Sequence, residues 1–174
     1  MIVTAHYGAW EVGSKFWPSC GFETAVVARR VKNPLVDHFV TVIRSAHGVR
    51  VIHARDAVRQ AIRWLKDGRL LAILIDHRVT EGGLMVPFFG RPASTTSLPA
   101  ILALRYSIPV HMVRCWRQNA KVKIHIDPAI DFSDLSQNEE GILEATKRMS
   151  AVVEGWVRER PKDWLWIHNR WKVV

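Results

Sequence analysis

The sequence has few cysteines, a shortage of acidic residues and no long hydrophobic run. Two cysteines in 174 residues are too few for a disulfide framework, so a reducing compartment is expected. No run approaches the roughly 18 apolar residues of a membrane-spanning helix, and no secretory signal is visible. The 16 acidic residues are outnumbered by 25 lysines and arginines, which gives a net charge of +9. This excess favours anionic partners: nucleic acid, phospholipid head groups, phosphorylated substrates or acidic carrier proteins.

The composition is that of a globular protein, with 48% hydrophobic and 24% charged residues. The length suits a single domain over residues 1–174 with a core of its own. Eight tryptophans are unusually many, and tryptophan prefers places with one apolar and one wet side, such as membrane interfaces. The sequence has no glycine-rich nucleotide-binding motif and no histidine spacing typical of a metal site, so neither a cofactor nor a metal is expected.

Apolar, strand-like segments alternate with amphipathic helical ones, which predicts an α/β fold with a mixed, largely parallel sheet covered by helices. The helix over 33–48 has Asn33 as N-cap and Gly48 as stop, and Asp56 caps the helix over 56–68. A helix or turn over 9–17, ended by Pro18, and a loop from 77 to 99 that is rich in glycine and proline are also expected. The remaining predicted strands are 1–5, 23–29, 49–53, 69–76, 109–117 and 121–126, and the remaining helices are 97–107 and 139–160.

The segment TAHYGAWE, residues 4–11, places His6 just after the first predicted strand and Glu11 five positions further on. On one continuous helix these two side chains would lie about 140° apart. They can meet only if His6 ends the strand and Glu11 lies in the first turn of a following helix. A carboxylate bound to one imidazole nitrogen fixes the tautomer and leaves the other nitrogen as a base. The alternative is a capped turn with an exposed histidine.

Four segments in order resemble the lipid A secondary acyltransferases, the lauroyl and myristoyl transferases within the wider glycerolipid acyltransferase superfamily. The first, TAHYGAWEVG, is similar to that family's motif of a histidine, four residues and an acid. The resemblance continues over residues 26–52, 71–117 and 161–172, and so spans essentially the whole chain. It implies an α/β acyltransferase sandwich in a single domain.

The resemblance implies transfer of a fatty acyl chain from a thioester, commonly acyl carrier protein, to a lipid hydroxyl in lipid A and lipopolysaccharide biosynthesis. His6 is then the general base and Glu11 its orienter. The hydroxyl attacks the thioester directly, so no covalent enzyme intermediate is implied and neither cysteine is needed. The partners are the acyl donor, a lipid A precursor and a membrane surface, without nucleic acid. The expected location is the cytoplasmic face of the bacterial inner membrane, with this chain peripheral.

Other residues receive possible substrate-binding roles from the same resemblance. Arg44 is a phosphate ligand or a solvated helix arginine. Asp76, which ends a buried strand, orients Arg44 or another base, or else caps a turn. In PFFGRPAST, Phe89 lines an acyl slot or belongs to the core, and the backbone near Gly90 binds the thioester oxyanion. Further residues with possible head-group, carrier or bracing contacts are Arg91, Arg114 and Arg170.

Three alternatives stay open. Full-length members of the family usually carry an N-terminal membrane helix and further segments before the histidine, and this chain begins five residues before His6. A non-catalytic, truncated lipid-binding domain is therefore one alternative, and a basic nucleic-acid-binding domain is another. A third keeps the chemistry and changes the acceptor to a glycerolipid, an aminolipid or a phosphoinositide mannoside.

Overall fold

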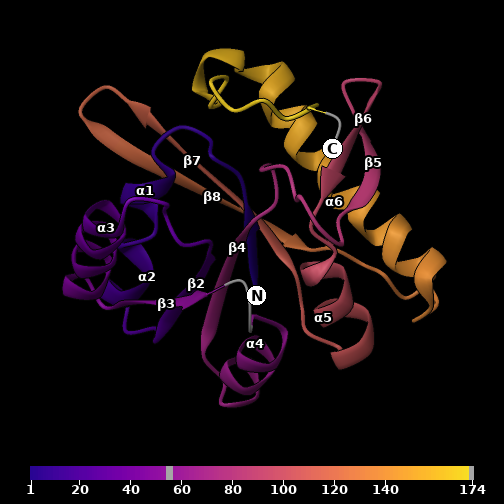
Figure 1. Ribbon diagram of the computed structural model, residues 1–174, viewed down its shortest axis with the longest axis horizontal. Coiled ribbons are helices and arrows are strands. Elements are labelled where there is room, and N and C mark those ends of the chain that lie inside the picture. The colour runs from indigo at the N-terminus through magenta and orange to yellow at the C-terminus, as the bar shows by residue number, and fades with distance from the viewer. Residues whose placement is uncertain (54–56, 173–174) are drawn as a thin grey trace.

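A six-stranded sheet forms the centre of the molecule in the computed structural model, which describes residues 1–53 and 57–172 (Figure 1). Its strand order is β3-β2-β4-β1-β7-β8, and every neighbouring pair is parallel except β7 and β8. The predicted α/β class with a mixed, largely parallel sheet is therefore confirmed. The strands are β1 (Ile2–Thr4), β2 (Thr24–Ala28), β3 (Val49–His53), β4 (Leu70–Leu74), β7 (His111–Gln118) and β8 (Lys121–Ala129).

Helices cover both faces of this sheet (Figure 1). One face packs on the larger core, to which α4, α5 and α6 contribute Trp64, Leu102 and Met149. The other face has a smaller apolar cluster that includes Ile2, with Trp17 of α2 packed against it. The helices are α1 (Trp10–Gly13), α2 (Phe16–Ser19), α3 (Pro34–Ala46), α4 (Ala57–Lys66), α5 (Leu98–Tyr106), α6 (Glu139–Glu159) and the 3-10 helix η2 (Pro161–Asp163).

The caps of the long helices follow the sequence signals. The Asn33 side chain accepts hydrogen bonds from the backbone N–H groups of Leu35 and Val36, with Pro34 as the first helical residue of α3. Gly48 follows the helix with a φ of 75°, a conformation that favours glycine. The predicted cap Asp56 lies outside the described residues.

Two predictions about the connections were wrong. The helix or turn expected over 9–17 is two short helices, α1 and α2, and Pro18, which was expected to end it, lies within the second of them. The loop expected over 77–99 contains a β-hairpin of β5 (Leu84–Phe88) and β6 (Arg91–Thr95). The prolines and glycines of this segment argue against strands in the sequence. Pro87 and Pro92 are nevertheless tolerated, because they lie opposite each other in a two-stranded ribbon outside the main sheet.

Candidate active site

The register between β1 and β4 places His6 next to Asp76. The two parallel strands pair Ile2 with Ala72 and Thr4 with Leu74, a constant offset of 70 positions. The same offset two residues further on joins His6 to Asp76, just beyond the carboxyl ends of both strands. The His6 Nδ1 atom lies 2.8 Å from Asp76 Oδ1. This edge of a parallel sheet is where α/β folds form ligand sites.

Asp76 is held by three hydrogen bonds and is almost fully buried. Its Oδ2 atom accepts from the His6 backbone N–H and from the Trp164 indole N–H, both at 2.9 Å. Burial by itself raises the pKa of this carboxyl group, but the hydrogen bonds from His6 and Trp164 and the charge of His6 outweigh it, so the pKa lies below its ordinary value. An ionised Asp76 can only accept, so the Nδ1–H group of His6 donates the hydrogen bond between them. The Nε2 atom is then left unprotonated and able to act as a base.

The sequence predicts that Glu11 binds His6, but in the structure the carboxylate that binds His6 is Asp76. Glu11 accepts two hydrogen bonds from the Arg44 guanidinium, at 2.8 and 2.9 Å, so this carboxylate holds α1 to the last turn of α3. The bond to Arg44 and the nearby charges of Arg44 and His6 keep the pKa of Glu11 below its usual value, although partial burial opposes them. The sequence spacing brings Glu11 near His6, but a third side chain takes the hydrogen bonds.

His77 stacks on the His6 ring, and His168 stacks on the far side of His77. The His77 ring lies 3.7 Å from the His6 ring with an interplanar angle of 7°, and the His168 ring lies 4.1 Å beyond His77. His168 is fixed in turn, because its Nε2 accepts the backbone N–H of Arg78 at 2.9 Å. The edge of Trp10 contacts the His6 ring at 5.4 Å between ring centroids. The imidazole of His6 is therefore held by contacts with two rings as well as by Asp76.

The stack makes folding stability depend on pH in the acid range. Desolvation between the two neighbouring rings lowers the pKa of His77 to about 4, and repulsion from His6 adds to this effect. In the unfolded chain a histidine binds a proton near pH 6.5. Between these two pH values the unfolded state holds more protons, so stability falls as the pH decreases.

We expect the His77→Gln variant to lose less stability than the parent between pH 7 and pH 4, because it lacks this proton uptake. Denaturant unfolding at a series of pH values measures the difference. It should be small, since the His77 side chain is exposed at one side. Parallel stability curves for parent and variant would show that the stack does not disfavour protonation of His77.

An apolar cavity of about 640 Å³ opens beside His6. Ile2 and Thr4 of β1 line it together with His6 just beyond the strand, as do residues of β2 and β4. Its walls include aromatic and aliphatic side chains from α1, α2 and α3, and Glu11 and Arg44 stand at its polar end. The volume is typical of small-molecule sites. The further apolar lining residues include Trp10, Trp17, Val26, Val40, Val113 and Ile124.

Three predicted residues of the PFFGRPAST segment lie away from this cavity. Phe89 and Gly90 form the turn of the β5–β6 hairpin with positive φ values of 52° and 70°. The Phe89 backbone N–H donates to Glu154 of α6, and the guanidinium of Arg91 lies over the Trp171 ring. Among the described lining residues, Thr96 and Ser97 at the start of α5 reach the cavity instead. The geometry therefore does not support an acyl slot at Phe89 or an oxyanion site at Gly90.

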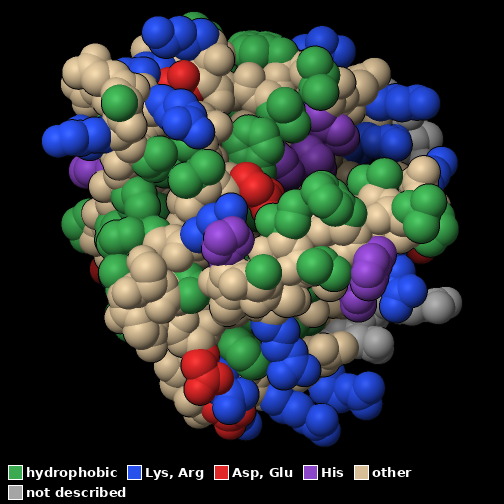
Figure 2. Space-filling model, turned by 90° about the vertical axis from the view of Figure 1, so that its left-hand side faces the viewer, with side chains coloured by type: hydrophobic (Ala, Val, Ile, Leu, Met, Phe, Trp, Pro, Cys, Tyr) green, Lys and Arg blue, Asp and Glu red, His purple; other side chains and the backbone are tan. Residues whose placement is uncertain are grey.

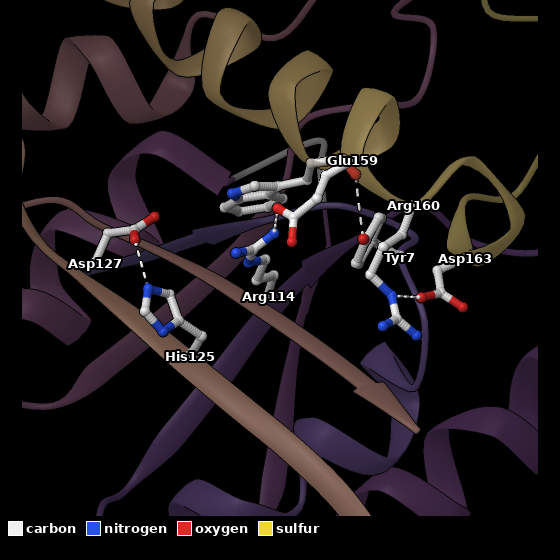
Figure 3. Close-up of polar contacts among 8 residues, drawn as sticks. Tyr7, Arg114, His125, Asp127, Glu159, Arg160 and Asp163 are labelled. Carbon is white, nitrogen blue, oxygen red and sulfur yellow. Dashed lines mark hydrogen bonds and ion pairs between the residues drawn. The ribbon is translucent and has the colours of Figure 1, made fainter. Parts of the chain in front are cut away.

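The remaining two predicted residues are engaged within the protein. Arg114 points from β7 toward α6, where its guanidinium pairs with Glu159, close to the pair between Arg160 and Asp163 (Figure 3). Arg170 is 1% exposed and donates to the Ser94 carbonyl and the Thr95 hydroxyl. Burial lowers the pKa of Arg170 to about 10. The bracing role, one of those considered for Arg170, is the one that fits its surroundings.

The C-terminal segment clamps the pair of His6 and Asp76. Trp164 is 4% exposed, binds Asp76, and lies opposite Tyr7 in an isolated β-bridge. The next residue, Leu165, donates its backbone N–H to the His6 carbonyl. At Gly8 the chain turns so close to β7 that an added Cβ would lie 2.1 Å from the Cys115 carbonyl oxygen. The strand end that carries His6 is thus fixed on both sides.

The other groups that could carry chemistry are limited. Cys115 is buried and lines the cavity, and burial raises the pKa of its thiol to about 11, which disfavours the nucleophilic thiolate at neutral pH. Within residues 1–53 and 57–172, no three histidine, cysteine or carboxylate side chains gather in a way that would hold a metal ion. None of the helices in these same ranges is both long and apolar enough to cross a bilayer.

An imidazole held by a buried carboxylate at the wall of an apolar cavity is an arrangement that can remove a proton from a hydroxyl group of an apolar ligand. Comparison with known proteins identifies the family of this chain. Residues 1–173 match the family described as bacterial lipid A biosynthesis acyltransferase. The chain belongs to this family, as the sequence motifs predicted.

Individual relatives are similar at low identity. A lipid A biosynthesis acyltransferase of Haemophilus influenzae is 26% identical over 99% of this chain and 55% of its own length. A phosphatidylinositol mannoside acyltransferase of Mycolicibacterium smegmatis is 22% identical over 98% of this chain and 56% of its own length. The chain thus spans about half the length of the curated relatives it matches.

Proposed function

We propose that this domain transfers a fatty acyl chain from an acyl thioester to a hydroxyl group of a glycolipid, with His6 as the general base. The observation that carries the proposal is the bond between His6 Nδ1 and Asp76 beside the apolar cavity. In the described part of the chain the His6 Nε2 atom has no hydrogen-bond partner, so it is available to a substrate hydroxyl. The buried carboxylate stabilises the imidazolium that forms when His6 takes the proton.

The reaction requires no protein nucleophile. His6 Nε2 removes the proton as the lipid oxygen attacks the thioester carbonyl, and the thiol of the donor leaves with that proton. The chain's own part is to hold the base, to accommodate the acyl chain among the apolar side chains of the cavity, and to exclude water. Acyl carrier protein is the proposed donor, because an acidic carrier complements a net charge of +9.

The proposed acceptor is a phosphorylated glycolipid, with a lipid A precursor first and a phosphatidylinositol mannoside second. Relatives named for both acceptors match this chain over nearly its whole length. Arg44 supports a phosphate near the site, since its guanidinium lines the cavity and Glu11 fixes its orientation. The proposed location is the cytoplasmic face of the inner membrane.

The test is transfer of a labelled acyl group from acyl carrier protein to three detergent-dispersed acceptors: a tetra-acylated lipid A precursor, a phosphatidylinositol mannoside and a lysophospholipid. We expect ester formation on one of the two glycolipids, and no acyl group attached to the protein when the acceptor is left out. Because Cys115 lies at the cavity, the Cys115→Ala variant is the control, and it should still transfer. A labelled acyl-enzyme in the parent that is absent from this variant would contradict direct transfer.

A further inference from the structure

The apolar stripe of α3 faces away from the protein. Leu35, Phe39 and Val42 recur at the spacing of one helical face, yet their side chains are 79%, 63% and 49% exposed. The opposite side of the helix faces inward, where Val40 lines the cavity and Arg44 binds Glu11. No residue of α3 is buried. Amphipathic helices of globular proteins normally place their apolar face on the core, so this stripe calls for a partner outside the described residues.

The exposed apolar area extends beyond the helix. Val31 and Val36 are 43% and 45% exposed next to the stripe. The short helix α2 adjoins the other end of α3, since a Cβ on Gly48 would lie 3.0 Å from Pro18. We call the set of exposed apolar side chains along this face the α3 surface. Its members are Phe16, Phe22, Val31, Leu35, Val36, Phe39 and Val42.

Positive charge borders the α3 surface. From Arg29 to His47 the sequence has four lysine and arginine residues, of which Arg44 faces inward to Glu11, and one acidic residue, Asp37. Arg30 and Lys32 are exposed directly before the helix. The Asp37 carboxylate accepts the backbone N–H of Val31, and thus serves the local turn. A cationic rim around exposed aliphatic and aromatic side chains is the pattern of helices that lie in the interface of an anionic bilayer.

The α3 surface also borders the mouth of the cavity. Arg29, Val31, Val40 and Arg44 belong to the cavity wall as well as to the α3 region. Figure 2 shows the face that carries α3, where hydrophobic side chains surround a hollow containing acidic and histidine side chains. A flat partner resting on this face would therefore lie directly over the entrance to the site.

We propose that the α3 surface docks on an anionic phospholipid bilayer, so that the cavity opens toward the lipid head groups. This inference rests on the proposed function, because a lipid acceptor could then enter the site without leaving the membrane. A second copy of the chain fits this face less well, since a symmetric contact would bring the same arginines and lysines of both copies together. An anionic bilayer would bury the apolar stripe and pair its negative head groups with the positive rim.

The test is flotation with vesicles of phosphatidylethanolamine and phosphatidylglycerol, using the full chain. The parent should float with these vesicles, and much less with neutral phosphatidylcholine vesicles. The pair Leu35→Ser and Phe39→Ser should weaken the partition at least about tenfold, as expected for withdrawing two large apolar side chains from a bilayer. The pair Arg30→Gln and Lys32→Gln should weaken it roughly fivefold per charge, with the loss suppressed by salt.

Matched controls separate docking from folding and from chemistry. Met85→Ser with Tyr106→Ser removes two other exposed apolar side chains, of 54% and 41% exposure, from β5 and α5. Arg63→Gln with Lys66→Gln removes two exposed charges from α4. Both control pairs should float like the parent. All variants should transfer acyl groups to a detergent-dispersed acceptor at the parental rate, while the α3 variants lose activity on the same acceptor in vesicles.

Three results would overturn the docking proposal: a parent that fails to float, α3 variants that float like the controls, or α3 variants that change the oligomeric state in solution without changing flotation. The last would identify a second copy as the partner. Failure of the proposed function looks different, because it would leave flotation and its dependence on α3 intact while no acceptor is acylated in detergent.

Discussion

The His6→Gln variant loses acyl transfer by roughly 10²–10⁴-fold, the range expected when a general base is removed. Glutamine can still donate a hydrogen bond to Asp76, so the strand end should keep its position. It cannot take a proton from the lipid hydroxyl, and the attack on the thioester then depends on water as the base. Initial rates with saturating donor and acceptor measure the loss, which should lie in kcat.

The control for this variant is a test that it still folds. Thermal unfolding and vesicle flotation should match the parent, because the His6 side chain contributes little to the larger core and lies away from the α3 surface. A variant that folds normally and transfers acyl groups at the parental rate would exclude His6 as the base. A variant that fails to fold would direct the test to Asp76, whose replacement acts through the same ring.

The Asp76→Asn variant should lose kcat by roughly 10²–10⁴-fold, as expected for a base forced into the wrong tautomer. The hydrogen bonds around Asp76 give the reason. Oδ2 accepts from both the His6 backbone and the Trp164 indole, so an asparagine must place its carbonyl oxygen there. Its amide NH₂ group then faces His6 Nδ1 and donates to it. The proton of the imidazole moves to Nε2, which can no longer act as a base.

The matched comparison for this prediction is Glu11→Gln. Glu11 binds Arg44, and the exchange weakens that bidentate pair without touching the His6 Nδ1 atom. We therefore expect Glu11→Gln to raise the acceptor KM, because Arg44 loses its fixed orientation, while the pH profile of kcat stays that of the parent. If Glu11→Gln shifts that profile and Asp76→Asn does not, the assignment of the two carboxylates is reversed.

The sequence predicts the elements of this fold well and their pairing poorly. Alternation of apolar strands with capped helices identifies the α/β class, because each strand and helix has a local signal such as Asn33 and Gly48. No local signal tells which strands become neighbours. The offset of 70 positions that joins His6 to Asp76 arises from the pairing of β1 with β4, which only the folded chain establishes.

In the candidate site too, the sequence identifies individual residues but not which of them contact each other. His6 is identified by its place after a strand, and Asp76 by its place at the end of a buried one. Glu11 was expected to be the orienting group from its spacing and from the family resemblance, but in the structure its carboxylate binds Arg44 of α3. Periodicity finds the apolar face of α3 but not its direction, since the pattern is the same whether the face meets a core or a membrane. The stacking of His77 and His168 depends on segments that are distant in the chain.

The most direct test of the central claim, that Asp76 holds His6 with Nε2 free to act as a base, is nitrogen NMR of the His6 ring at neutral pH. Spectra of ¹⁵N-histidine-labelled protein, assigned with His6→Gln, report which ring nitrogen carries the proton. We predict the Nδ1–H tautomer in the parent and in Glu11→Gln, and the Nε2–H tautomer in Asp76→Asn. An Nε2–H tautomer in the parent, or one that changes with Glu11 and not with Asp76, would contradict the account.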